Sequence, residues 1–207
     1  MAGSYNLILV TGSMRSGTTL LQQVLCCAPD ANPFIHGCRY LTAQIETFAR
    51  YAGPDRLYIE DYLGGPQELF AFTRDILDRL LQETHRRLGE PRHLVLKNPE
   101  LGRVLLPAAA LLPQARFIVS VREPKDTIAS MITVGEKHRE SGVASFLARS
   151  GRDIEQLCAA YRQFYAPVLQ VLKEDDSRLK ERICLVPYES LIRDTDAAVS
   201  KCRPFFA

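Results

Sequence analysis

The feature that most constrains the fold is an apolar run that passes through a glycine-containing loop directly into a helix. Residues 7–11 form the run, Gly12 and Gly17 bracket the loop, and residues 18–27 carry a helical pattern. Glycines at these positions let backbone N–H groups approach an anion closely, and the start of the helix adds its positive end. The segment therefore predicts the first strand of a parallel sheet, with an anion site at its carboxyl end.

Short apolar runs and helical patterns alternate along the rest of the chain. We expect strands at residues 7–11, 93–96, 116–121 and 182–186, and helices at residues 18–27, 41–51, 66–88, 101–112, 124–136 and 153–173, with a last helix starting near residue 188. The sequence shows no internal repeat and no long linker. This order predicts one α/β domain over residues 1–207, a three-layer P-loop-like fold with a central parallel sheet flanked by helices.

The nearly balanced charge limits the partners that the chain can attract. The formal net charge is +2, and 46% of the residues are apolar. This composition favours a globular protein and argues against a broad surface for nucleic acid or membrane. Residues 7–10, the first apolar run, are far fewer than the roughly 20 needed to span a bilayer. Only six residues precede the run, so we expect neither a membrane span nor a leader peptide.

The cysteines indicate the compartment and argue against a metal site. They show neither paired C-x-x-C spacing nor the spacing with histidine that zinc sites use. Buried, reduced thiols are the expected state, which favours a reducing, cytoplasmic location. The six positions are Cys26, Cys27, Cys38, Cys158, Cys184 and Cys202.

The residues that follow the strands point to an anion site without a metal. In open α/β sheets, ligands bind beyond the carboxyl ends of the strands. Lys97, Arg122 and Tyr188 follow the second, third and fourth expected strands. A nucleoside-triphosphatase loop reads G-x-x-x-x-G-K-[ST] and works with a carboxylate at a neighbouring strand end. Here Thr18 stands in place of that lysine. The second and third expected strands are followed by the cations Lys97 and Arg122, where such an enzyme would have a carboxylate.

Side chains of the loop and of a later helix extend this anion site. Arg15 supplies a cation within the loop, and Thr18 and Thr19 supply hydroxyl donors. Ser130 comes eight residues after Arg122, about two helical turns further on. Arg122 and Ser130 are therefore expected to reach one phosphate near the edge of the sheet.

Three segments in matching order resemble the sulfotransferases that use 3′-phosphoadenosine 5′-phosphosulfate (PAPS). They are "RSGTTLL", "RFIVSVREPKDTIAS" and "ICLVPYESLI", and the resemblance covers about residues 5 to 200. It implies that the loop holds the 5′-phosphosulfate, that Arg122 and Ser130 hold the 3′-phosphate, and that Tyr188 lies beside the nucleotide. The residues implied for the loop are Arg15, Ser16, Gly17, Thr18 and Thr19.

The resemblance also implies an activity. A sulfuryl group would pass from PAPS to a hydroxyl or amine of a small-molecule, carbohydrate or peptide acceptor, without a metal, leaving 3′,5′-ADP. Arg15 and Lys97 are the cations expected to stabilise the charge that develops on the bridging oxygen. The chain ends at "KCRPFFA", where relatives usually continue, so we expect the C-terminal part of the usual domain to be missing.

The general base has two candidates. One class of relatives places a histidine two residues after the strand-end lysine, where this chain has Pro99, so Glu100 is a shifted substitute. Another class places a glutamate after the first helix, close to His36. We favour His36 slightly, because an imidazole suits a base at neutral pH. His138 is expected to lie on a helix surface.

Two other functions and two structural questions stay open. A kinase-type phosphotransferase shares this kind of fold, and a non-catalytic PAPS-binding relative would keep the nucleotide site without turnover. The acceptor and the oligomeric state are not encoded in any recognisable motif. Five aromatic residues either line an acceptor pocket or belong to the core: Tyr40, Phe48, Tyr51, Tyr58 and Tyr62.

Overall fold

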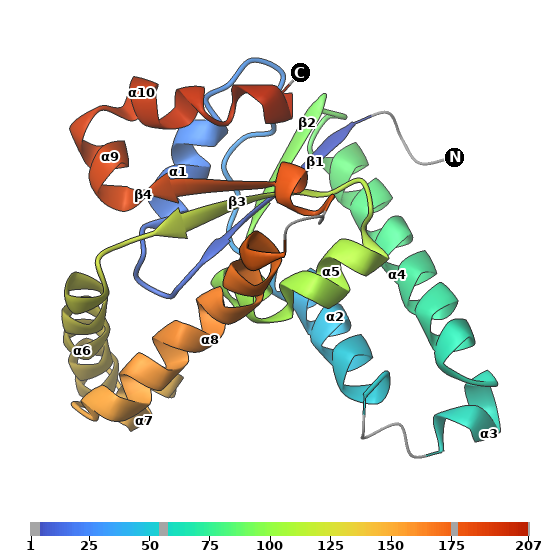
Figure 1. Ribbon diagram of the computed structural model, residues 1–207, viewed down its shortest axis with the longest axis horizontal. Coiled ribbons are helices and arrows are strands. Elements are labelled where there is room, and N and C mark those ends of the chain that lie inside the picture. The colour runs from blue at the N-terminus through green and yellow to red at the C-terminus, as the bar shows by residue number, and fades with distance from the viewer. Residues whose placement is uncertain (1–4, 54–57, 175–177, 207) are drawn as a thin grey trace.

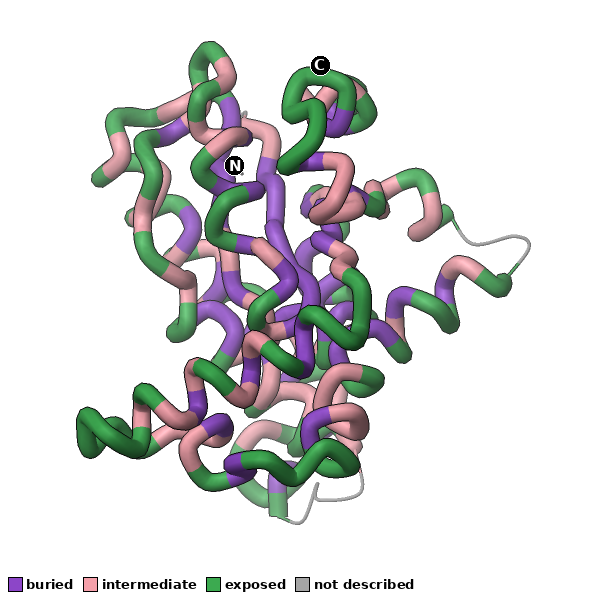
Figure 2. The backbone as a smooth tube through the Cα atoms, turned by 90° about the vertical axis from the view of Figure 1, so that its left-hand side faces the viewer, coloured by how far each residue is buried: buried purple, intermediate pink, exposed green. Residues whose placement is uncertain are grey.

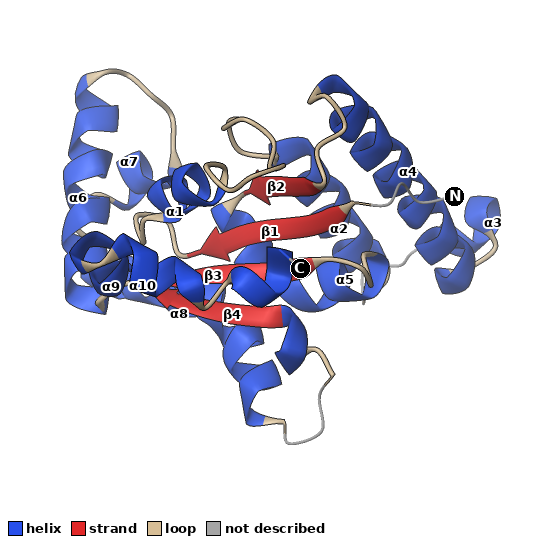
Figure 3. Cartoon of the chain, turned by 90° about the horizontal axis from the view of Figure 1, so that it is seen from above, coloured by secondary structure: helices blue, strands red, loops and turns tan. Residues whose placement is uncertain are grey.

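A parallel sheet forms the centre of the molecule. The computed structural model describes residues 5–53, 58–174 and 178–206. Within these ranges the strands lie in the order β2-β1-β3-β4, and each neighbouring pair is parallel (Figure 3). Their bounds are β1 Asn6–Gly12, β2 His93–Lys97, β3 Arg116–Val121 and β4 Ile183–Pro187. The predicted α/β class and parallel sheet are confirmed.

Helices cover both faces of the sheet, which gives three layers (Figure 1). One face carries α1 (Thr18–Leu25), α9 (Tyr188–Arg193) and α10 (Thr195–Ser200). The opposite face carries α2 (Arg39–Tyr51), α4 (Pro66–Arg87), α5 (Leu105–Leu111) and α8 (Ile154–Lys173). Beyond the carboxyl ends of the strands lie α6 (Pro124–Glu140) and α7 (Phe146–Ser150), while the short α3 (Ile59–Leu63) lies beside α4.

The alternation of side chains along β1 explains the two cores. Successive residues of a strand point to opposite faces of the sheet. Leu7 and Leu9 pack in the core under α2, α4, α5 and α8, whereas Ile8 and Val10 pack in the core under α1, α9 and α10. Figure 2 shows the consequence, a buried path through the strands with exposed segments around it. Because both faces of the sheet are covered, the middle of β1, residues 7–10, is apolar on both sides.

Several elements differ from those that the sequence predicts. The expected helix over residues 101–112 is a 3-10 helix, Pro99–Val104, followed by α5. Pro107 has no N–H to donate, so it fits only the first turn of an α-helix, which therefore starts at Leu105. The helices α3 and α7 were not predicted, because each has five residues and is too short to show a helical period.

No helix within the described ranges is both long enough and apolar enough to cross a membrane.

A buried asparagine attaches the segment after α1 to the outer edge of the sheet. Asn32 is fully buried, its Oδ1 accepts a hydrogen bond from the N–H of Val95 at 2.6 Å, and its Nδ2 donates to the carbonyl of Val95 at 3.3 Å. The side-chain amide thus gives Val95 the two hydrogen bonds that a neighbouring strand would otherwise supply on the outer side of β2. The segment that leads to His36 takes its course from this attachment.

Removing this amide should destabilise the protein. Asn32→Ala leaves the buried N–H of Val95 without its partner, while the Val95 carbonyl keeps only the 3.4 Å bond from Gln22, which should lower the free energy of unfolding by about 1–3 kcal/mol. Urea denaturation measures the change. Gln23→Ala on the exposed side of α1 is the control and should change stability by less than about 0.5 kcal/mol. Equal stability of the two variants would contradict a structural role for Asn32.

Candidate active site

The structure brings the strand-end cations and the glycine-bracketed loop together. The Nζ of Lys97 donates a hydrogen bond to Thr19 Oγ1 at 3.2 Å. The Nη1 of Arg122 donates to the carbonyl of Arg15 at 3.1 Å, and the Nε of Arg15 donates to Ser130 Oγ at 3.2 Å. Residues from β2, β3, α6 and the loop after β1 thus form one cluster, as the rule for parallel strand ends predicts. Their roles toward a ligand stay predictions.

A pocket of about 170 Å³ opens between this loop and α9. The guanidinium of Arg122 lies over the ring of Tyr188, 4.6 Å from its centroid. The Nε of Arg122 is buried, and no residue of the described chain accepts a hydrogen bond from it. A buried N–H without a partner is rare, so this donor is available to an anion. The pocket is lined by Arg15, Gly17, Thr18, Thr19, Leu20, Arg122 and Tyr188.

Both loop glycines are required by close approach and by backbone conformation. Gly12 has φ 144° and Gly17 has φ 90°, values that other residues rarely adopt. A Cβ on Gly12 would collide with the carbonyl oxygen of Ser120, and one on Gly17 would collide with the ring of Tyr188. The loop therefore lies directly against β3 and α9.

Hydrogen bonds inside the loop fix its shape. The hydroxyl of Ser16 donates to the carbonyl of Ser13 at 2.7 Å, and the hydroxyl of Ser120 donates to the carbonyl of Ser16 at 2.6 Å. The hydroxyl of Tyr165 accepts from the N–H of Ser13 at 3.2 Å and donates to the carbonyl of Ser120 at 2.9 Å. The side chain of Ser16, predicted to contact the nucleotide, is fully buried and bonded within the loop. Its hydroxyl therefore holds the loop in shape.

Arg15 has a backbone conformation that favours glycine. Its φ is 67°, in the left-handed region, which costs a residue with a Cβ about 1–2 kcal/mol. Strain of this kind persists where the side chain is needed for function. The guanidinium of Arg15 bonds to Ser130, and the side chain lines the pocket.

Two substitutions separate this strain from the side chain's function. Arg15→Gly should be more stable than Arg15→Ala by about 1 kcal/mol, because only alanine keeps the strained Cβ. Both variants should lose affinity for a bound anion to a similar degree. Thermal denaturation and titration with 3′,5′-ADP measure the two effects. If the alanine variant were the more stable, the left-handed conformation of residue 15 would be wrong.

Lys97 is half-buried at the end of β2. Burial lowers its pKa from the ordinary lysine value, the nearby Cys38 partly offsets this, and the charge of Arg39 lowers the pKa further. A partly desolvated ammonium group interacts more strongly with a developing negative charge than one in water does. The environment of Lys97 therefore suits a catalytic cation.

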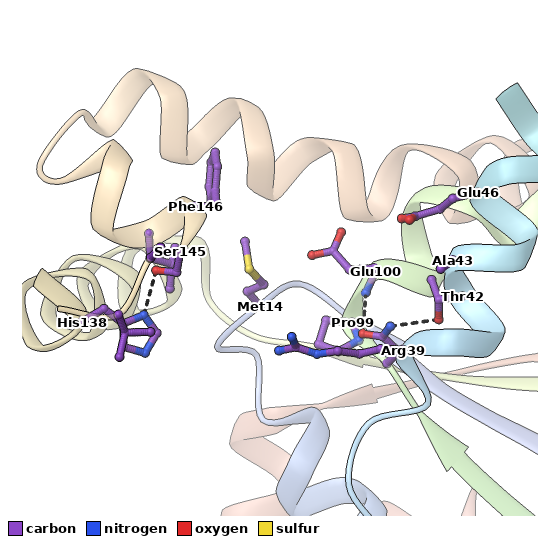
Figure 4. A pocket seen from close by; sticks show the side chains of 14 residues that line it. Met14, Arg39, Thr42, Ala43, Glu46, Pro99, Glu100, His138, Ser145 and Phe146 are labelled. Atoms are coloured by element: carbon purple, nitrogen blue, oxygen red, sulfur yellow. Dashed lines mark hydrogen bonds between the residues drawn. The ribbon is translucent and has the colours of Figure 1, made fainter. Parts of the chain in front are cut away.

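A second, larger cavity of about 690 Å³ adjoins the loop at Met14 (Figure 4). Glu100 lines it and forms an ion pair with Arg103 at 3.0 Å. Glu46 lines it from α2, and burial, followed by the charge of Glu100, raises the pKa of Glu46. A carboxyl group with a raised pKa in a cavity is a candidate for acid–base chemistry. Other lining residues are Arg39, Thr42, Ala43, Asn98, Ser145 and Phe146.

His138 also lines this cavity, from the last turn of α6. Its Nδ1 lies 2.8 Å from the hydroxyl of Ser145, which accepts a hydrogen bond from the N–H of Ala148 at the start of α7. From the sequence His138 is expected on a helix surface, and no motif points to Glu46. Thr42 and Glu46 are four residues apart, so they lie on the same face of α2. This spacing was the one sequence signal that could have placed Glu46 beside Thr42.

The two predicted bases occupy different pockets. His36 is exposed, and its ring contacts that of Phe34 edge-on, with centroids 5.8 Å apart. It lines a pocket of about 220 Å³ with Leu80 and Thr84 of α4. Glu100 lines the 690 Å³ cavity instead. The structure thus does not bring His36 into the cavity that adjoins the loop.

The five aromatic residues considered for an acceptor pocket lie elsewhere. None of them, all of which the structure describes, lines the 690 Å³ cavity. Phe48 packs against Phe70 beside the core, with ring centroids 5.8 Å apart. Tyr40, Tyr58 and Tyr62 are more than half exposed.

The described residues also contain no group of three or more His, Cys, Asp or Glu side chains arranged to hold a metal ion.

Comparison with known proteins assigns the family. The model of the sulfotransferase family matches residues 8–206. The chain belongs to the sulfotransferase family, and its family and fold make it a transferase.

Solved structures of similar fold include sulfotransferases of low sequence identity. The sulfotransferase domain of the Synechococcus PCC 7002 olefin synthase is 20% identical with a TM-score of 0.60, and the match covers 96% of this chain and 72% of that domain. The sulfotransferase domain from the curacin biosynthetic pathway is 20% identical with a TM-score of 0.59, covering 98% and 74%. The sulfotransferase STF9 from Mycobacterium avium is 14% identical with a TM-score of 0.63, covering 99% and 64%. These likenesses show the fold.

Proposed function

We propose that this protein transfers a sulfuryl group from PAPS to a hydroxyl or amine of an acceptor held in the cavity beside Met14. The observation that carries the proposal is a small pocket lined by Arg15 and Arg122, with the Nε of Arg122 buried and unbonded among the described residues and with Lys97 bonded to Thr19 of the pocket wall. Membership of the sulfotransferase family supports it.

The pocket beside Tyr188 suits the two anionic parts of PAPS. These are the 5′-phosphosulfate, which supplies the sulfuryl group, and the 3′-phosphate. Arg122 and Ser130 would bind the 3′-phosphate, since the bond from Arg15 to Ser130 brings α6 next to the loop. Arg15, Thr18 and Thr19 would bind the 5′-phosphosulfate. Tyr188 would hold the guanidinium of Arg122 in place through its ring.

The 690 Å³ cavity would hold the acceptor. Its lining combines apolar side chains, such as Phe146 and Met14, with charged groups, as ligand sites generally do. A neutral hydroxyl must lose its proton as it attacks, and the base must lie within hydrogen-bond reach. Of the two predicted bases, Glu100 lines this cavity, whereas His36 lines another pocket. A small molecule, a sugar or a peptide side chain are all acceptors that this lining permits.

Binding of 3′,5′-ADP tests the proposal. It should raise the melting temperature of the wild-type protein, whereas Mg-ATP should not, because the loop has Thr18 where a triphosphatase has its lysine. Stabilisation by Mg-ATP alone would favour the kinase-type alternative. Binding of 3′,5′-ADP without turnover of PAPS on any acceptor would favour a non-catalytic relative.

Substitution of Arg122 tests the assignment of the phosphates. Arg122→Ala should weaken 3′,5′-ADP at least about tenfold, or 1.4 kcal/mol. It should spare adenosine 5′-phosphosulfate, which lacks the 3′-phosphate. Isothermal titration measures both affinities, and Arg193→Ala on exposed α9 is the control. Equal losses for the two ligands would refute the assignment.

The cytoplasmic location expected from the cysteines stays a prediction, which fractionation of cells producing the native protein would test.

A further inference from the structure

Two cysteines from distant parts of the chain are in contact. Cys184 lies on β4 and Cys202 follows α10, and their sulfur atoms are 3.7 Å apart. Figure 1 shows β4 on the side of the sheet where α10 and the C-terminal end of the chain lie. Both residues pack in the core under α1, α9 and α10. At van der Waals distance, the two thiols need only a small approach to form a bond.

The two thiols differ in exposure in a way that suits oxidation. Cys184 is half-buried on β4, an outer strand of the described sheet, so small oxidants have access to it. Cys202 is 1% exposed, directly behind it. A redox-active pair commonly combines an accessible attacking thiol with a second thiol that resolves the product.

The surroundings of Cys184 favour its thiolate. A hydrogen bond from Cys202 and the charge of Lys201 lower the pKa of Cys184 despite its burial, while the same contact and burial raise the pKa of Cys202. By contrast, burial raises the pKa of Cys26 to about 11 and that of Cys38 to about 12. The thiolate is the reactive form, so Cys184 should react before these two cysteines.

We propose that Cys184 and Cys202 form a reversible disulfide when the protein meets hydrogen peroxide. The thiolate of Cys184 attacks one peroxide oxygen, the O–O bond breaks, and the released hydroxide takes up a proton to become water. The sulfur of Cys202 then attacks the sulfenic acid of Cys184, the S–S bond forms, and the hydroxyl leaves with the proton of Cys202 as a second water. The two thiols lose two electrons, and the peroxide gains them.

This bond would close a loop that contains part of the nucleotide pocket. The segment between the two cysteines includes α9, which begins at Tyr188, and Leu191 and Ala198 pack in the same core as Cys202. Closing this loop restricts the unfolded chain and so stabilises the folded one. The oxidised protein should therefore melt roughly 5–10 °C higher than the reduced protein.

Peptide mapping tests the proposal on the full chain. Reduced protein is treated with hydrogen peroxide, its remaining thiols are alkylated, and the digest is analysed by mass spectrometry. The expected product is a peptide pair joined through Cys184 and Cys202, which dithiothreitol separates. Cys184→Ser should lose both this product and the rise in melting temperature. Cys27→Ser, which changes an exposed cysteine after α1, should keep both.

Two results would overturn the proposal. One is Cys184 oxidised to a sulfinic acid while Cys202 remains a free thiol, and the other is a disulfide between other cysteines. Cys202→Ala should also lose the disulfide. Because Cys202 is buried, this variant is used only if its reduced form unfolds in a single transition. The half-buried Cys184→Ser variant keeps the test independent of that outcome.

Discussion

Lys97→Ala is expected to lower turnover at least about 100-fold, the scale for loss of one preorganised charge donor at a reacting group. Lys97 lies at the end of β2, and its ammonium group contacts Thr19 at the start of α1. A cation at this point would act on charge that develops as the bond to sulfur breaks. Because that charge is small before the reaction, the affinity for intact PAPS should change little, unlike that for 3′,5′-ADP, whose 5′-phosphate already carries the developed charge.

Steady-state kinetics and nucleotide titration together check this prediction. Lys125→Ala, an exposed lysine in the first turn of α6, is the matched control and should keep full turnover. Burial lowers the pKa of Lys97, so the lysine loses its charge at a lower pH than an exposed lysine does. The rate of the wild-type enzyme should therefore fall on the alkaline side before the usual lysine range is reached. A Lys97→Ala variant that loses only affinity would make Lys97 a binding residue.

Glu100→Gln is expected to lower turnover at least about 100-fold, the lower end of the range for loss of a general base. The amide keeps the size of the side chain but cannot take a proton from the acceptor. The cavity favours this candidate, because Glu100 lines it together with Met14 of the loop. His36→Ala should have a mild effect, because His36 lines another pocket.

Two controls make the comparison decisive. Arg103→Ala removes the ion-pair partner of Glu100 and should change turnover far less than Glu100→Gln does. Affinity for 3′,5′-ADP should be kept in all of these variants, which shows that the nucleotide pocket is intact. If His36→Ala abolishes turnover while Glu100→Gln leaves it unchanged, the imidazole is the base. If neither substitution matters, Glu46, which lines the same cavity, is the next residue to test as the base.

The pocket beside Tyr188 could be predicted from the sequence because the residues that follow the strands are visible there. The apolar runs end clearly at Lys97 and Arg122, and parallel strands bring their carboxyl ends to one edge of the sheet. The position of Tyr188 follows in the same way from the end of β4. Only residue order and the rule for parallel sheets were needed for this part of the site.

The 690 Å³ cavity beside Met14 could not be predicted in this way. Its walls depend on where α6 and α7 pack, and α7 is too short to show a period. His138 comes to the cavity because α6 continues to Glu140, one turn beyond its expected end. The segment of His36 follows the side-chain bonds of Asn32 to β2, which no hydrophobic pattern reveals. Side-chain contacts between distant segments therefore decided what the sequence left open.

Consecutive residues of the loop, Met14 and Arg15, line different pockets, and this limits how the protein can be redesigned. A larger or smaller residue at Met14 would change the volume of the 690 Å³ cavity. It would also shift the backbone of Arg15, the next residue, which lines the smaller pocket. Phe146 and Ala43 also line the larger cavity but belong to α7 and α2, away from the loop. An engineer who wishes to alter acceptor choice while keeping the donor should therefore vary these helical positions and leave the loop untouched.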